Sequence, residues 1–440
     1  MSDALRDKLQ HAFSHQAPEG VIVGLEGGIF FARLPDTEVG SCYVIERDSG
    51  RRPVAAELIG FRDDLARLLP FDDPSGVRPG AGVMRTDVGA RAPEAHACLG
   101  RVIGPLGRCL DGEREQLALT GPPLHARPPS PLERQPISQQ VETGVRALDA
   151  LLPLAQGQRV GLFAGSGVGK STLLAQLVRQ TRADVVIVAL VGERGREVAE
   201  FLRDAVPDPE RATMVVATSD APPAFRARAA LTATALAEAW RERGAHVLLV
   251  VDSLTRYARA LREIALAAGE PPARRGFPPS VFAALPRLLE RAGQGRTGAI
   301  TAIYSVLVEG GDMDEPIADE VRGLVDGHWV LRRKWADAGH FPALDLPGSV
   351  SRVAGAVASQ AALSDAAAVR GGLALLDERR DAVELGLYQP GNQPALDRAL
   401  DAWPATRAFL QQGADEHTPL SESLERLTDL AARFEDWGDR

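Results

Sequence analysis

The stretch RVGLFAGSGVGKSTLLAQL, residues 159–177, most strongly constrains how this chain can fold. It fits the phosphate-binding pattern G-x-x-x-x-G-K-[ST], except that Ala164 occupies the first glycine position. A β-rich run precedes the motif and a helical pattern follows it, which is the context that such a loop requires. The first position only has to fit a tight turn from strand to loop, so we expect alanine to be tolerated there. The residues predicted to bind a nucleotide are Gly165, Ser166, Gly167, Val168, Gly169, Lys170, Ser171 and Thr172.

Two side chains of this loop carry distinct parts of the predicted chemistry. A lysine at the position of Lys170 reaches the β- and γ-phosphates, and a hydroxyl at the position of Ser171 is a ligand of Mg²⁺. Backbone N–H groups at the start of the following helix add further donors for the phosphate oxygens. The chain has only three lysines against a large excess of arginine, so a lysine at this position is notable.

The composition is that of an acidic globular protein. The formal net charge is −9 at pH 7, and 45% of the residues are hydrophobic, which argues against a nucleic-acid partner. Apolar runs such as 185–191 are far shorter than the roughly 18 residues of a membrane span, and the charged N-terminus is unlike a signal peptide. Three cysteines without a C-x-x-C pair indicate neither a disulfide framework nor a zinc site. We therefore expect a cytoplasmic protein.

Hydrophobic patterns divide the chain into four parts. Residues 1–18 fit an amphipathic helix that could dock a regulator or the membrane surface, although a frayed terminal helix fits equally well. Residues 19–98 have short β-type runs broken by Gly and Pro, as in a small β-barrel or sandwich. Residues 99–355 alternate apolar strands with helical patterns, and residues 356–440 are helical throughout. This order predicts an α/β core with a parallel sheet, preceded by the β domain and followed by a C-terminal helical domain.

Two acidic residues stand at the ends of predicted core strands. Asp252 ends the apolar run HVLLVVD and lies where a Walker B carboxylate would orient water on Mg²⁺, although an N-cap of the next helix is the simpler reading of an isolated Asp. The phosphate-binding loop about 80 residues upstream favours the Walker B reading. Glu193, in LVGERGREV, could position the attacking water, or could be an ordinary solvated glutamate.

An arginine lies at the seam between the core and the helical domain. Arg352, in LPGSVSRVAG, could pair with a carboxylate of its own subunit. In a ring ATPase it could instead be an arginine finger that reaches the γ-phosphate of a neighbouring subunit.

Together these segments resemble a known family. The segments TGVRALDALLPLAQGQRVGLFAGSGVGKSTLL, GERGREV, VVDSLTRYARALREIALAAGEPPARRGFPPSVFAALPRLLERAG and SVSRV are similar to those of the catalytic ATPases of type III protein secretion and flagellar export. These ATPases are relatives of the F/V-type catalytic subunits. The resemblance runs from about Val21 to the C-terminal helices and implies a P-loop core of the RecA/F1 type.

The resemblance also implies roles for individual residues. Lys170 and Ser171 would contact phosphate and Mg²⁺, Glu193 would position water, and Asp252 would be the Walker B acid that serves the metal. Further residues implied in the site are Arg194 and Arg256 as contacts around the γ-phosphate, Arg352 as the finger supplied in trans across a hexamer interface, and Phe341 as an aromatic that stacks on adenine. Core packing is the alternative for Phe341.

The implied function is that of a homohexameric Mg²⁺-ATPase that powers substrate release and unfolding for type III secretion. The implied partners are a central stalk protein, a peripheral stator or regulator and chaperone–effector complexes, at the cytoplasmic face of the inner membrane. The segment ADEVR, residues 318–322, favours the injectisome branch over the flagellar one. The alternatives are a flagellar export ATPase, a rotary F/V-type subunit, an RNA translocase of the termination-factor type and a noncatalytic ring subunit. An RNA translocase would need a basic platform with aromatic residues, and the sequence of residues 1–95 shows no such cluster.

The chain departs from the family pattern at several positions. Gly311 stands where an acidic residue is expected, and Trp329 and Trp335 replace aliphatic residues. The pair Pro347–Gly348 is unusual in the segment that leads to Arg352. We expect these departures to affect subunit packing near the seam.

Overall fold

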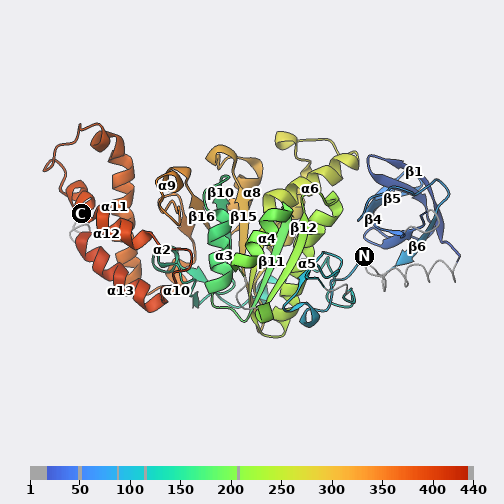
Figure 1. Cartoon of the computed structure of the whole chain (residues 1–440), viewed down its shortest axis with the longest axis horizontal. Coiled ribbons are helices and arrows are strands. Elements are labelled where there is room, and N and C mark those ends of the chain that lie inside the picture. Colours follow the sequence, from blue (N-terminus) through green and yellow to red (C-terminus); the bar gives the residue numbers. More distant parts are fainter. Residues whose placement is uncertain (1–16, 48–51, 87–88, 113–115, 206–208, 435–440) are drawn as a thin grey trace.

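The computed structural model describes residues 17–47, 52–86, 89–112, 116–205 and 209–434 of the chain. It has three parts in a row, with the β-barrel and the C-terminal helices at opposite ends of a central α/β core (Figure 1). The predicted fold class is confirmed. The predicted docking helix at the N-terminus falls largely on residues 1–16, which lie outside the described residues. In the part of the chain that the structure describes, no helix is both long and apolar enough to span a membrane.

The N-terminal domain is a closed six-stranded barrel in the order β1-β2-β5-β4-β3-β6. Its strands are β1 (Gly20–Glu26), β2 (Ile29–Arg33), β3 (Cys42–Ile45), β4 (Val54–Arg62), β5 (Leu65–Pro70) and β6 (Gly82–Thr86). Alternate side chains point inward, as in β5, where every second residue is buried. Closure pairs every strand edge, so the barrel form of our expectation is correct and the sandwich form is wrong.

The core is a nine-stranded sheet in which eight strands follow the order β17-β16-β10-β15-β13-β11-β12-β7, and β14 pairs with β15. Among the strands that the structure describes in this sheet, only β17 and β14 pair antiparallel with their neighbours. The strands are β7 (Val102–Ile103), β10 (Arg159–Ala164), β11 (Val185–Glu193), β12 (Ala212–Thr218), β13 (His246–Asp252), β14 (Gly293–Gln294), β15 (Ala299–Leu307), β16 (Gly327–Leu331) and β17 (Val350–Ser351). A separate two-stranded sheet pairs β8 (Gln140–Val141) with β9 (Leu154–Ala155).

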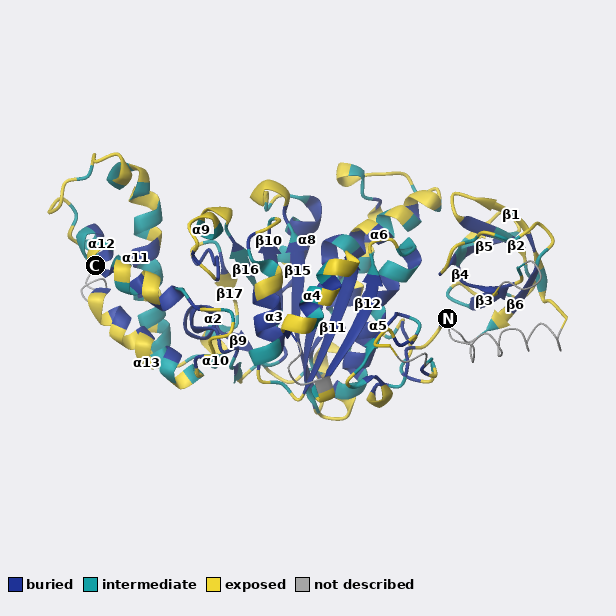
Figure 2. Cartoon of the chain, viewed as in Figure 1, coloured by how far each residue is buried: buried dark blue, intermediate teal, exposed yellow. Residues whose placement is uncertain are grey.

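Both faces of this sheet are covered, so its central strands are buried along their length (Figure 2). In β11, Val186, Val188 and Leu190 contribute to the core on one face, and the intervening residues contribute to the core on the other. The first face packs against α3 (Lys170–Gln180) and α4 (Gly195–Ala205), and the second against α5 (Pro223–Glu242), α6 (Leu254–Ala267), α7 (Pro279–Leu289) and α8 (Pro316–Leu324). Burial on both faces explains why these strands are continuous apolar runs in the sequence.

The C-terminal domain is joined to the core by apolar packing and by hydrogen bonds. It contains α11 (Gln360–Glu384), α12 (Pro394–Leu410) and α13 (Leu420–Ala431), while α2 (Arg146–Leu151), α9 (Arg333–Asp337) and α10 (Ala354–Val357) lie near the junction. The buried Arg146 donates to the carbonyl oxygens of Phe409 at 3.1 Å and Gln411 at 2.6 Å. From α3, Gln176 donates to the carbonyl oxygen of Glu416 at 3.2 Å. The segment between α12 and α13 is therefore attached directly to the helix that follows the phosphate-binding loop.

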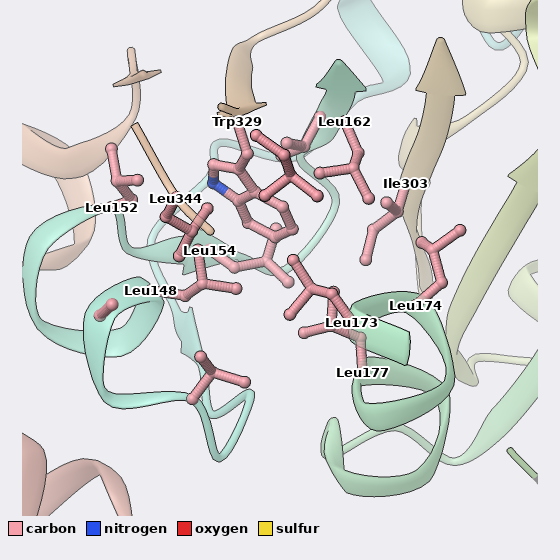
Figure 3. Close-up of a cluster of buried hydrophobic side chains, with 14 of the residues drawn as sticks. Leu148, Leu152, Leu154, Leu162, Leu173, Leu174, Leu177, Ile303, Trp329 and Leu344 are labelled. Atoms are coloured by element: carbon pink, nitrogen blue, oxygen red, sulfur yellow. The ribbon is translucent and has the colours of Figure 1, made fainter. Parts of the chain in front are cut away.

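The two unexpected tryptophans have different packing roles. Trp329, on β16, is 1% exposed and lies among Leu154, Leu162 and Leu344 in the core beside α3 (Figure 3). Trp335 lies at the junction, where its ring centroid is 5.9 Å from that of Trp403 on α12. Trp329 thus fills the interior of one domain, whereas Trp335 packs between two.

The backbone conformation and close contacts at Gly311 and Gly348 explain why glycine fits at these two departures from the family pattern. Gly311 has a φ of +81°, a left-handed conformation in which an acidic side chain would be strained. A Cβ on Gly348 would lie 2.5 Å from Oδ2 of Asp345, so glycine permits a close approach there. The Gly348 carbonyl also accepts a hydrogen bond from Nε2 of His328 at 3.1 Å.

Replacing Trp329 by alanine is expected to lower the free energy of unfolding of the core by about 3–5 kcal/mol, because the indole is fully enclosed by apolar side chains. Urea denaturation followed by far-UV circular dichroism would measure the loss. The control is Leu132→Ala, since Leu132 is 97% exposed and its truncation should change stability by less than about 0.5 kcal/mol. Equal midpoints for the two variants would contradict the packing role of Trp329.

Candidate nucleotide site

The phosphate-binding loop connects the end of β10 to the start of α3. Ala164, at the departing motif position, is the last residue of β10, is fully buried and pairs with Leu307 and Leu331 on either side. It is not among the described residues with a positive φ. The left-handed positions are Gly167 and Gly169, with φ of +72° and +88°. Alanine is therefore compatible with the first motif position, because the glycine-requiring turns come later in the loop.

Lys170 and Asp252 meet at the centre of the site although they are 82 residues apart. Nζ of Lys170 forms an ion pair with Oδ1 of Asp252, and the two side chains are 11% and 3% exposed. The same Oδ1 accepts a hydrogen bond from Oγ of Ser305 at 2.5 Å. These residues come from the carboxyl ends of β10, β13 and β15, which are neighbours in the sheet, and ligand sites of open α/β sheets lie at this edge.

Glu193 lies at the end of β11, beside the strand that carries Asp252. Its Oε2 is 3.0 Å from Nη2 of Arg256, and Nη1 of the same guanidinium donates to the Gly192 carbonyl. Burial, the negative charge of Asp252 and a hydrogen bond with the Glu197 carboxyl raise the pKa of Glu193 to about 8. That hydrogen bond lowers the pKa of Glu197. The site therefore holds a buried carboxyl group whose charge depends on its immediate neighbours.

A pocket of about 160 Å³ opens between these elements. The predicted residues among those lining it are Ser171, Thr172, Glu193 and Asp252, and Glu197 and Glu200 add acidic groups. Ser171 is exposed, whereas Asp252 and Glu193 are buried. Hard oxygen donors around a polar pocket beside a phosphate-binding loop suit a metal–phosphate complex.

Phe341 lies against the loop. A Cβ on Gly169 would be 3.2 Å from the Phe341 ring, and the Phe341 residue is 45% exposed. Its backbone carbonyl accepts a hydrogen bond from the Gln412 amide at 2.9 Å. This exposure disfavours plain core packing, and the ring is available to stack on a planar group.

Two predicted arginines lie outside this cluster. Arg194 is 74% exposed at its side chain and lies 3.6 Å from Glu197. Arg352 is exposed and follows the edge strand β17, where its guanidinium donates to the Arg322 carbonyl at 3.2 Å. Among the described residues, no carboxylate lies within ion-pair distance of Arg352. The structure thus shows no intrasubunit charge partner for it in the described part of the chain.

Our sequence reasoning missed three residues of the site. Glu197 lies in the first turn of α4, and its carboxyl group forms a hydrogen bond with that of Glu193 at the end of β11. Because Glu193 belongs to a strand, helical spacing gave no signal for this contact. Ser305 lies within an apolar strand without a motif around it, and Arg333 donates to the Ser166 carbonyl at 2.5 Å from a distant helix. Neither of these two could be assigned to the site without knowledge of strand order and tertiary contacts.

Comparison with known proteins gives concordant matches over nearly the whole chain. Residues 144–351 match the nucleotide-binding domain of the ATP synthase alpha/beta family, and residues 358–429 match the C-terminal domain of the T3SS EscN ATPase. A flagellum-specific ATP synthase of Pseudomonas aeruginosa is 44% identical over 94% of this chain and 93% of its own length. A type 3 secretion system ATPase of Sinorhizobium fredii is 45% identical over 93% and 92%.

Solved structures of type III secretion ATPases match the fold of this chain as well. The assembled ATPase EscN of enteropathogenic E. coli is similar with a TM-score of 0.88 at 42% identity, over 94% of this chain and 100% of that chain. The same ATPase in complex with its central stalk EscO gives a TM-score of 0.85 at 41% identity, with the same coverage.

Proposed function

This chain belongs to the family of type III secretion and flagellar export ATPases, and we propose that it works as a Mg²⁺-dependent homohexamer that serves an injectisome. It binds ATP and hydrolyses it to energise protein secretion, the activity shared by its relatives. The observation that supports our assignment of residues is the pocket lined by Asp252 and Glu193, with Lys170 paired to Asp252.

We assign separate roles to the residues of this pocket. Lys170 and the backbone N–H groups of the loop would bind the phosphates of ATP. Glu193, held by Arg256, would orient the attacking water and accept its proton. Phe341, which lies against the loop, would stack on the adenine ring, and the exposed Arg194 would contact the γ-phosphate.

The donor set fits Mg²⁺. The hydroxyl of Ser171 and the carboxylate of Asp252 would hold it, with the phosphates of ATP completing the oxygen ligands. Among the described residues there is no group of three or more His, Cys, Asp or Glu that could hold a metal ion alone, which suits a cation brought in with the nucleotide. When bound, the metal would neutralise charge that develops on the phosphate oxygens.

The position of Arg352 supports the proposed ring. Because Arg352 lies on an exposed edge segment away from its own pocket, it would complete the site of a neighbouring subunit. Head-to-tail interfaces of this kind form a ring when the rotation between successive subunits closes. The solved structure titled as the assembled ATPase EscN supports such an assembly by similarity.

The partners are proposed by the same similarity. A central stalk protein would contact the ring, as EscO does with EscN. A peripheral stator or regulator and chaperone–effector complexes are the other proposed partners, with the ring at the cytoplasmic face of the inner membrane.

Overall sequence identity does not separate the two branches of the family, since flagellar and secretion relatives match almost equally well. The choice of the injectisome therefore depends on the ADEVR segment, and flagellar export is the second candidate.

The test of this function is a chromosomal Glu193→Gln substitution in the source bacterium, with secreted proteins and swimming scored together. Loss of effector export with normal swimming is expected. Loss of swimming alone would assign the chain to flagellar export, and no change in either would contradict the export function. The matched control is Glu242→Gln, the same charge change at an exposed residue near the end of α5.

A further inference from the structure

The carboxylate of Asp252 receives two side-chain donors on a single oxygen. Lys170 forms its ion pair with Oδ1, and Oγ of Ser305 donates to the same atom at 2.5 Å. Among the described residues, these are the two side chains that donate to Asp252. The Asp252 side chain is 3% exposed and Ser305 is fully buried, so this carboxylate depends on protein donors rather than on bulk water.

One of these donors has a second task in the proposed reaction. The ammonium of Lys170 is the group that would bind the β- and γ-phosphates, so ATP draws it away from Asp252. Ser305 has no such competing partner. It lies on β15, between the strand that ends at the loop and the strand that ends at Asp252, and it pairs in register with Leu162.

We propose that Ser305 is a positioning residue for ATP hydrolysis: its hydroxyl fixes the Asp252 carboxylate toward the metal–phosphate complex when Lys170 moves to the phosphates. This inference deepens the proposed function and rests on it. Ser305 itself touches neither the nucleotide nor the metal. A hydrogen bond to a charged oxygen is stronger than one between neutral groups, which suits a group that has to hold a carboxylate in one orientation.

The same strand provides a matched control. Thr301 lies four residues before Ser305 on the same face of β15 and is also fully buried. Its hydroxyl accepts from the Gly157 amide at 2.9 Å and lies 2.8 Å from Nε2 of His246, so it contacts no residue of the nucleotide pocket. Thr301→Ala therefore removes a buried hydroxyl from the same strand without changing the support of Asp252.

The experiment compares Ser305→Ala, Ser305→Thr and Thr301→Ala in the full chain. Steady-state phosphate release gives kcat and KM for ATP, and a fluorescent ADP analogue gives Kd with Mg²⁺ and with EDTA. Ser305→Ala should lower kcat about 10–100-fold, the usual loss for such a supporting group, and weaken ADP binding only when Mg²⁺ is present. Ser305→Thr keeps the hydroxyl and should restore both quantities. Thr301→Ala should leave both close to the wild-type values.

Several outcomes would overturn this role. They are a Ser305→Ala variant with wild-type kcat and unchanged Mg²⁺ dependence, an equal loss in Thr301→Ala, or no rescue by Ser305→Thr. If Ser305→Ala does not bind ADP in EDTA and so has not folded, Ser305→Cys replaces it with the same expected losses, because a thiol is only a weak donor. A wild-type chain without Mg²⁺-dependent hydrolysis would instead refute the proposed function.

Discussion

Replacing Glu193 by glutamine is expected to lower kcat for ATP hydrolysis by about 10²–10⁴-fold, the range contributed by a positioned general base. Glutamine keeps the size of the side chain and its contact with Arg256 but cannot accept a proton from water. The affinity for ATP should change little, because Lys170 and the loop amides would bind the phosphates. Steady-state phosphate release and equilibrium binding of a fluorescent ATP analogue measure the two quantities separately.

The pH profile provides an independent readout of the same residue. A carboxyl group can act as a base only above its pKa, and the pKa of Glu193 is raised to about 8 by burial and by Asp252. We therefore expect kcat/KM of the wild-type chain to rise with pH, to reach half of its maximum near pH 8 and to level off above it, and we expect this rise to disappear in Glu193→Gln. Glu242→Gln should keep both the rate and the profile of the wild type. A Glu193→Gln variant with more than about a tenth of the wild-type kcat would contradict the base role.

The parallel sheet could be predicted because its strands are buried on both faces. Continuous apolar runs such as 246–252 and 299–307 coincide with β13 and β15, since burial on both faces removes the polar alternation that would blur their limits. The proximity of Lys170 and Asp252 followed from the same pattern, because parallel strands bring their carboxyl ends to one edge. By contrast, β16 and β17 were not predicted: they are five and two residues long and lie beside loops with Pro and Gly.

The rest of the site depended on information that a single sequence does not carry. Whether alanine fits the first motif position depends on the backbone there, which a sequence motif does not describe. Ala164 fits because it ends β10 and is not among the described residues with a positive φ. Ser305 reaches Asp252 because β15 lies between β10 and β13 in the sheet. This strand order differs from the order of the strands along the chain, so the contact could not be predicted. Trp329 stood out in the sequence only as a departure from the family pattern. Its packing role could not be predicted, because the side chains that enclose it come from segments far apart in the chain.

Replacing Arg352 by alanine is expected to lower kcat by about 10³–10⁵-fold, the range associated with an arginine finger. Under the proposed trans role, the loss would arise at the site of the neighbouring subunit, since within its own subunit the Arg352 guanidinium donates to the Arg322 carbonyl. Arg352→Lys should also be strongly impaired, since an ammonium lacks the planar fork that matches phosphate oxygens. Phosphate release measured over a range of protein concentrations should show that wild-type specific activity rises as the ring assembles.

Mixing variants decides whether Arg352 acts in trans. A head-to-tail ring takes the phosphate-binding loop of each site from one subunit and the finger from the next. Mixing Arg352→Ala with Lys170→Ala at equal amounts therefore rebuilds about a quarter of the interfaces with both groups intact, and a corresponding fraction of activity should return. Lys170→Ala mixed with Glu193→Gln is the control, because both groups belong to one subunit's pocket and no intact site can form. No restoration in the Arg352 mixture would place the finger in its own subunit and remove the structural reason for a ring. Equal restoration in the control would show that mixing raises activity without rebuilding a site across an interface, and this would also contradict the trans role.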